Sequence, residues 1–230
     1  MRAKAGPEPK SGTKFRILET ATRLFAEHGL DGVALRDIAV DAEVNGAAIN
    51  YHFGTKDLLI REVYRRLFLE LNKHRIKALD DCEVAAQGTK LEVSQVIRAL
   101  TEPMVRFSTS KENGGIYLVR LMFHAYGVRR DFVDKSIAEQ IDHIALRFIA
   151  ALEKAAPGIN REELFWRFDF AIGACQHILI DPQRGHRLKR LSGELCDTDD
   201  NDRIIDQLTD SITASFVAPN LAPSKKRRGR

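Results

Sequence analysis

Apolar residues recur at helical spacing along most of this chain, and the signals that mark β-strands are nearly absent. The first apolar stripe begins soon after Thr13 and ends before Gly29, a residue type that often terminates helices. No segment alternates polar and apolar residues over the length of a half-buried strand, and no Asn-Gly hairpin lies between two β-branched runs. The sequence therefore predicts an all-α protein.

Capping residues, glycines and prolines divide the chain into roughly nine expected helices. The residues expected to cap the later ones are Thr55, Thr89 with Glu92, Asn160 with Glu163, and Asp197 or Thr198. The helix after Thr55 is expected to be long and to end near Leu79. A looped stretch is expected between the last two long helices, the second of which ends near Phe216.

Length and composition exclude several classes of protein. The 230 residues are 44% hydrophobic and 30% charged, which suits a globular protein with a sizeable core and not a disordered chain. Three cysteines without a Cys-x-x-Cys pair argue against a disulfide scaffold and favour a reducing compartment. No apolar run reaches membrane-spanning length, and no secretory signal is recognised. We therefore expect a soluble, cytoplasmic protein with no membrane partner.

The net charge of +4 is concentrated at the two ends of the chain. Residues 1–12 are rich in Gly, Pro and Lys, and residues 219–230 hold five Lys and Arg and no acid. Both segments are expected to be disordered basic tails, which is compatible with contact to nucleic acid. The alternative is that they are solvated ends without a partner, and we favour this alternative for the C-terminal tail.

Residues 35–53 contain two short amphipathic segments joined by a tight turn. Ile38 and the small Ala39 lie on the apolar face of the first segment, and Ile49 and Phe53 are anchors one turn apart in the second. Two short helices with a three- to four-residue turn predict a helix-turn-helix. The alternative is a plain helical hairpin in a bundle.

The second of these helices leaves small and polar side chains on its outer face. Ala47 and Ala48 can meet thymine methyl groups, and the amide of Asn50 can pair with a base edge in the major groove. Tyr51 and His52 can donate to phosphates, which fix position and not sequence.

Two neighbouring segments add to this surface. Thr55 and Lys56 start the next helix, whose N-terminal amides form a phosphate site. Arg36 lies in the first turn of the preceding helix, from where it can reach the DNA backbone or a groove.

A run of 44 residues around this motif resembles the DNA-binding domain of TetR/AcrR-family transcriptional regulators. It extends from Arg16 to Leu59 and reads RILETATRLFAEHGLDGVALRDIAVDAEVNGAAINYHFGTKDLL. The resemblance implies an N-terminal three-helix DNA-binding domain over residues 13–60 and a C-terminal helical effector-binding and dimerisation bundle over residues 61–218. The DNA-contacting residues that we expect are Arg36, Asn45, Gly46, Ala47, Ala48, Asn50, Tyr51, His52, Thr55 and Lys56.

The same resemblance implies a ligand-responsive regulator. A homodimer would bind a palindromic operator in double-stranded DNA, most often as a repressor, and a small effector would release it. The last two long helices, near 161–180 and 200–216, would pair with those of a second copy. We expect Leu208 and Ile212 in this interface, and Trp166 either in the core or at the dimer seam.

The motif departs from the family pattern at two positions. Ala34 stands where a Ser or Thr cap is usual, a change that typically costs about 1 kcal/mol, part of which Asp37 can offset from the first turn. Glu43 stands where Gly is usual in the turn. If this position has a left-handed backbone, Glu costs about 1 kcal/mol more than Gly.

The C-terminal half carries a weaker resemblance. The segment from Glu163 to Ala174, ELFWRFDFAIGA, is similar to regulators of the PsrA branch, several of which respond to long-chain fatty acids or related acyl compounds. This implies an apolar pocket, for which the candidate residues are Phe107, Leu121, His124, His143, Phe148 and Phe170. The alternative is a solid core with the histidines at the surface.

The expected chemistry of the effector follows from one predicted helix. Its apolar stripe comprises Val133, Ile137, Ile141, Ile144, Phe148 and Leu152. No Arg or Lys lies in this stripe, so we expect a mainly apolar molecule with one polar end, such as an acyl chain or its thioester.

An all-helical enzyme and a structural adaptor are the alternative function classes. The seven histidines form no HExxH motif, and there is no Gly-rich phosphate loop and no GxSxG. The acidic cluster from Asp197 to Asp202 lacks the Gly and the bidentate Glu of a calcium loop. We therefore expect no enzyme activity, no cofactor and no metal.

Overall fold

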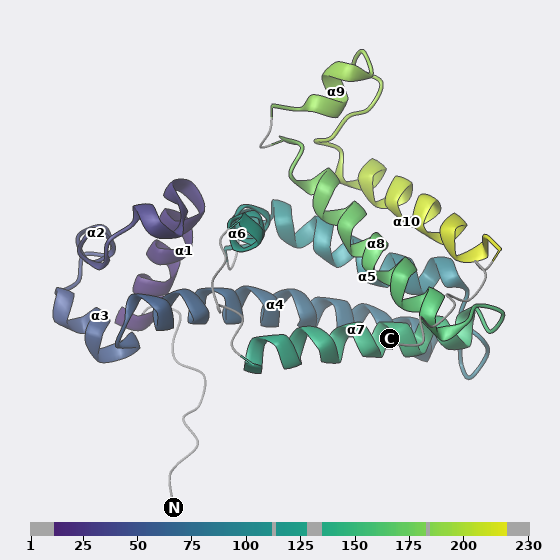
Figure 1. Cartoon of the computed structure of the whole chain (residues 1–230), viewed down its shortest axis with the longest axis horizontal. Coiled ribbons are helices and arrows are strands. Elements are labelled where there is room, and N and C mark those ends of the chain that lie inside the picture. The colour runs from purple at the N-terminus through teal and green to yellow at the C-terminus, as the bar shows by residue number, and fades with distance from the viewer. Residues whose placement is uncertain (1–11, 112–113, 128–134, 183–184, 220–230) are drawn as a thin grey trace, which may run out of the picture. The chain divides into compact units, whose positions relative to one another are not determined.

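The computed structural model describes the backbone of residues 12–111, 114–127, 135–182 and 185–219, and the side chains of the same residues except 123–127 and 135–140. Every regular element in these residues is a helix, which confirms the all-α prediction (Figure 1). The helices are α1 Thr13–Gly32, α2 Leu35–Asp41, α3 Gly46–Phe53, α4 Lys56–Ala85, α5 Val93–Thr109, α6 Gly115–Gly127, α7 Lys135–Ala155, α8 Arg161–Leu179, α9 Arg187–Leu191 and α10 Asn201–Val217.

The chain divides into two compact units. The N-terminal unit consists of residues 1–73 and 106–142, and the C-terminal unit of residues 74–105 and 143–230. The boundary expected at residue 60 remains a prediction, as do the two tails, which lie almost wholly outside the described residues. None of the described helices is long and apolar enough to cross a membrane.

The core of the N-terminal unit forms around α1, which packs against α2, α3 and α6. Ile17 and Phe25 of α1 are fully buried together with Ile38 of α2 and Ile49 of α3. The helical spacing of these apolar residues is what aligns them on one face of each helix. The helices α1, α2 and α3 thus share one core, and α3 leads into the start of α4 (Figure 1).

A buried hydrogen bond joins α4 to α6 within the same unit. The hydroxyl of Tyr64 donates to the carbonyl oxygen of Leu121 at 2.6 Å, and burial raises the pKa of Tyr64 above its ordinary value. Because burial disfavours the phenolate, the hydroxyl stays protonated and keeps its role as a donor.

Two long helices, α8 and α10, lie side by side in the C-terminal unit (Figure 1). α8 turns Leu164, Phe168 and Cys175 inward, and α10 turns Ile205 and Ile212 inward. Each helix therefore has its apolar stripe buried within the protomer.

Local capping confirms some of the expected helix ends. Gly29 interrupts α1 with a left-handed φ of 76°, as a helix-terminating glycine does. The side chain of Asn160 caps α8 by accepting the backbone N–H of Glu163 at 2.9 Å.

Other expected ends are wrong because a competing residue takes the role. Thr89 does not cap α5: its hydroxyl donates to Ala86, and the Gln95 side chain instead accepts the backbone N–H of Glu92. Asp200, and not Asp197 or Thr198, caps α10 by accepting the N–H of Arg203.

Two further differences concern the lengths of helices. α4 runs to Ala85, about six residues beyond the expected end near Leu79. The stretch expected to be looped before the last helix contains a five-residue helix, α9.

Candidate nucleic-acid interface

The helix-turn-helix is built by two buried pairs and a tight turn. Ile38 and Ala39 of α2 and Ile49 and Phe53 of α3 are all buried. The N–H of Val44 donates back to the carbonyl oxygen of Ala39 at 3.0 Å, which closes the turn between the helices.

The turn contains a residue in the left-handed region. Glu43 has a φ of 52°, so the conformation that favours glycine is present, as the departure from the family pattern suggested. Its side chain is exposed. The backbone strain is therefore not offset by burial of the side chain.

The start of α2 keeps half of a capping box. Ala34 offers no side-chain cap, but the carboxylate of Asp37 accepts the backbone N–H of Ala34 at 2.9 Å. The expected compensation by Asp37 is thus a direct hydrogen bond, beyond the favourable charge at the helix N-terminus.

The outer surface of α3 combines a capped start with small and polar side chains. The amide oxygen of Asn45 accepts the N–H of Ala47 at 2.9 Å, so this side chain is engaged in capping. Asn50 is exposed, and Tyr51 is 85% exposed with its ring 5.1 Å from that of His52. Gly46 and Ala47 are also exposed, whereas Ala48 and His52 are half-buried.

The start of α4 lies directly after α3. The hydroxyl of Thr55 accepts the N–H of Leu58 at 3.2 Å and thereby caps α4, while Lys56 is half-buried. The N-terminal end of a helix carries a partial positive charge, which favours an anion at the start of α4.

The guanidinium of Arg36 adds a charge on α2. Its side chain is 88% exposed and lies 3.4 Å from the carboxylate of Asp37. Such an exposed pair is worth little, so Arg36 can turn to a phosphate at small cost.

One exposed residue of this surface was missed by the sequence reasoning. Val40 on α2 is 79% exposed, although it is large and aliphatic. Its position off the stripe of Ile38 and Ala39 is the signal that could have found it. A methyl-bearing side chain there suits contact with a thymine methyl or a deoxyribose.

The expected effector residues are scattered. Phe107 and Leu121 are buried in the N-terminal unit, and Phe148 is buried in the C-terminal unit. The side chain of His124 lies outside the described residues.

Two of the expected effector residues do not face a protein interior. Phe170 is 66% exposed, because α8 buries Phe168 and Ala171 on its other face. His143 is exposed as well, and the neighbouring Ile141 is 38% exposed, so the inward stripe of α7 is shorter than expected.

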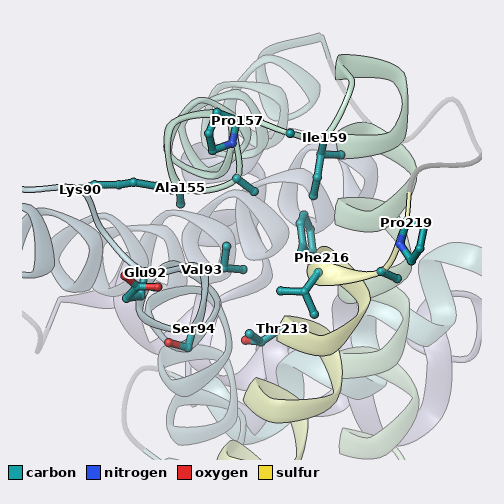
Figure 2. Close-up of a pocket in the computed structure, with 14 residues that line it drawn as sticks. Lys90, Glu92, Val93, Ser94, Ala155, Pro157, Ile159, Thr213, Phe216 and Pro219 are labelled. Atoms are coloured by element: carbon teal, nitrogen blue, oxygen red, sulfur yellow. The ribbon is translucent and has the colours of Figure 1, made fainter.

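A pocket of about 480 Å³ lies elsewhere in the C-terminal unit (Figure 2). The start of α5, the segment joining α7 to α8 and the end of α10 line it, with Glu92, Ile159 and Phe216 among its residues. None of the expected effector residues lines it. The hydroxyl of Thr213 beside it is buried and has no hydrogen-bond partner among the described residues.

No group of His, Cys, Asp or Glu side chains in the described part of the chain is arranged to hold a metal ion.

Two family models match the chain. Residues 17–63 match the bacterial regulatory proteins of the tetR family, and residues 98–215, just over half of the chain, match the tetracyclin repressor-like C-terminal domain.

Curated relatives match mainly the N-terminal part. Over 57 residues the chain is 44% identical to the HTH-type transcriptional repressor Rv3405c of Mycobacterium tuberculosis, which covers 25% of this chain and 30% of that repressor. Over 80 residues it is 38% identical to the HTH-type transcriptional repressor KstR2 of Rhodococcus jostii, with coverage of 34% and 36%. The chain thus spans about a third of the length of these relatives.

Solved structures extend the likeness of fold over most of the chain. PfmR from Thermus thermophilus superposes with a TM-score of 0.61 at 16% identity and covers 86% of this chain and 97% of PfmR. KstR2 of Mycobacterium tuberculosis gives a TM-score of 0.60 at 15% identity, with coverage of 89% and 94%. At these identities the likeness establishes the fold alone. With the two family models and the helix-turn-helix geometry, the chain belongs to the tetR family of bacterial regulatory proteins.

Proposed function

We propose that this protein is a ligand-responsive transcriptional regulator that inserts α3 into the major groove of an operator. The observation that carries the proposal is the outer surface of α3, where Asn50 and Tyr51 are exposed beside small residues on a rigid, capped helix. A short helix with small side chains can approach base edges closely.

The residues of this surface divide into two roles. Asn50 and the α3 alanines read base edges, while Tyr51, His52, Lys56 and the α4 amides hold phosphates. Asn45 and Thr55 act through their caps, because their side-chain oxygens already accept backbone N–H groups. Arg36 reaches the DNA backbone from α2.

An exposed aromatic face on α8 supports a homodimer. Trp166 and Phe170 are 54% and 66% exposed, and their rings lie 5.9 Å apart, one helical turn from each other. Gly173 continues this face without a side chain. Exposed aromatic clusters of this kind usually mark interfaces. We infer that a second copy covers this face and thereby sets the spacing of two α3 helices on a palindromic operator.

Repression with release by a small, mainly apolar effector is the mode we propose. The Mycobacterium tuberculosis and Rhodococcus jostii relatives are both named as repressors. The similarity of residues 163–174 to the PsrA branch supports an acyl compound as the effector. Release requires that the effector bind the DNA-incompetent arrangement more tightly than the competent one.

A mobility-shift assay with the DNA upstream of the protein's own gene tests this function. We expect specific binding in the nanomolar range that Asn50→Ala and Tyr51→Ala weaken, and no such loss in Lys77→Ala, a control at a 72% exposed side chain on α4. An enzyme or an adaptor would give no specific shift. If the protein binds DNA only non-specifically, with equal affinity in all variants, the proposal is contradicted.

A further inference from the structure

Arg75, on the part of α4 that belongs to the C-terminal unit, is a buried cation that pairs with no carboxylate in the described part of the chain. It is only 8% exposed. Its Nε donates to the carbonyl oxygen of Leu100 at 3.2 Å, and its Nη2 lies 3.0 Å from the sulfur of Met104. Among the described residues, these two contacts are the hydrogen bonds of the guanidinium, and no carboxylate contributes to the shift of its pKa.

The charge of Arg75 is retained at neutral pH. Burial lowers its pKa to about 10, so it remains protonated. The nearby Cys175 on α8 does not supply the opposite charge, because burial raises the pKa of its thiol to about 11. Among the described residues the guanidinium thus has no anionic partner, and Leu79, Ile97 and Leu100 of the same unit are fully buried.

A second buried arginine in the same unit shows what full compensation looks like. Arg167 is 5% exposed, and its Nε lies 3.0 Å from the carboxylate of Glu163. Three backbone carbonyl oxygens accept its remaining donors. Arg75 has one backbone carbonyl and a weakly accepting sulfur instead. Since an unpaired buried charge is strongly unfavourable, a structural role alone does not account for Arg75.

We propose that Arg75 binds the carboxylate of an acidic effector whose apolar body lies among the neighbouring core residues. This inference rests on the proposed function as a ligand-responsive regulator and adds a charge to its effector. Guanidinium donors match a carboxylate in geometry as well as in charge. The cation comes from α4 and not from the apolar stripe of α7, which holds no Arg or Lys.

The test compares matched ligands on the full-length protein. Dodecanoate, hexanoate and 4-phenylbutyrate each have a neutral counterpart in dodecanol, hexanol and 4-phenylbutanol, and dodecyl phosphate carries a different anion. We expect at least one carboxylate to raise the melting temperature and to bind about tenfold to hundredfold more tightly than its alcohol. Equal binding of acids and alcohols, or no binding of any acid, overturns the proposal. Tighter binding of dodecyl phosphate than of every carboxylate overturns the choice of a carboxylate.

Arg75→Met removes the charge and keeps a similar apolar length. We expect this variant to melt at the same or a higher temperature without ligand, and to lose the preference for the acid. Arg98→Met, at a 45% exposed side chain on α5, is the control and keeps the preference. A variant that melts lower and still prefers the acid contradicts the proposal. If Arg75→Met does not fold, the preference of the wild type for acid over alcohol remains decisive.

Operator binding separates the two claims. If a carboxylate binds through Arg75 but the protein shows no specific DNA binding, this inference is supported and the proposed function is contradicted. Specific DNA binding with no response to any carboxylate leaves the regulator intact and removes the acidic effector.

Discussion

The guanidinium Nη1 of Arg167 on α8 lies 2.6 Å from the carbonyl oxygen of Ser215 in the last turn of α10. Nη1 also donates to the carbonyl oxygen of Ala218, and Nη2 donates to that of Pro219, each at 3.0 Å. The last carbonyls of a helix have no partner within it. Arg167 therefore caps the C-terminus of α10 from a neighbouring helix and fixes how the two helices pack.

Arg167→Ala should destabilise the protein by about 3 kcal/mol. The substitution removes the partner of the buried Glu163 carboxylate. It also removes the donor to the last carbonyl oxygens of α10. Urea unfolding measures the loss. Arg161→Ala on the same helix is the matched control, because its pair with Glu153 is exposed and should contribute less than about 1 kcal/mol. Equal effects of the two variants would show that the capping of α10 does not contribute to stability.

Glu43→Gly should stabilise the protein by about 1 kcal/mol. At a φ of 52° glycine avoids the clash that an L side chain makes with its own backbone, although it also gains freedom in the unfolded chain. Ala42→Gly, at a φ of −79°, should be destabilising. A lower melting temperature for Glu43→Gly would mean that the exposed carboxylate, and not the backbone, decides the residue at this position.

The local geometry of the DNA-binding motif could be predicted from sequence because its determinants lie close together in the chain. Asn45 caps the helix that it precedes, and Ile49 and Phe53 bury the face that their spacing defines. The left-handed backbone at Glu43 was only raised as a condition, because Gly is usual at this position in the family that the motif resembles.

The C-terminal unit was harder to predict because long-range packing decides it. Arg75 and Arg167 both lie in helical segments, and only tertiary contacts reveal that both are buried and that one of them lacks an acid. Phe170 was expected inside because it is aromatic, yet the stripe of Leu164 and Phe168 places it on the opposite face. Thr89 lost its expected role because the side chain of Gln95 could cap α5 instead.

Phe170→Asp should give folded monomers. A charge in the aromatic face of α8 cannot be buried by a second copy, so dimerisation should weaken by at least about 100-fold and specific DNA binding should be lost. Sedimentation measures the association, and Val84→Asp at another exposed apolar site is the control.

Leu208→Asp has a different expected outcome. Leu208 and Ile212 are 8% and 5% exposed in the protomer, so they pack mainly within its own core, and their place in the dimer interface stays a prediction. A charge at Leu208 should unfold the protein, which circular dichroism detects. A folded monomer from Leu208→Asp, together with an intact dimer from Phe170→Asp, would place the interface on α10 and not on the aromatic face of α8.

Lys56→Ala should weaken binding to specific and non-specific DNA alike. The loss of one phosphate contact reduces the dependence of log K on log salt by about one unit. Tyr51→Phe should also lower affinity for all sequences, with no change in stability because the side chain is 85% exposed. Fluorescence anisotropy at several salt concentrations measures both. An unchanged salt slope in Lys56→Ala would exclude this lysine as a phosphate contact.

Selection of bound sequences from random DNA tests the central claim most directly. The account predicts a palindrome whose two half-sites are about 10 base pairs apart, or a multiple of that distance, since two copies present their α3 helices on one face of the duplex. In the same selection, Asn50→Ala should relax the preference at one position of each half-site. No enrichment over non-specific DNA, or a single asymmetric site with unchanged preference in Asn50→Ala, would contradict the account.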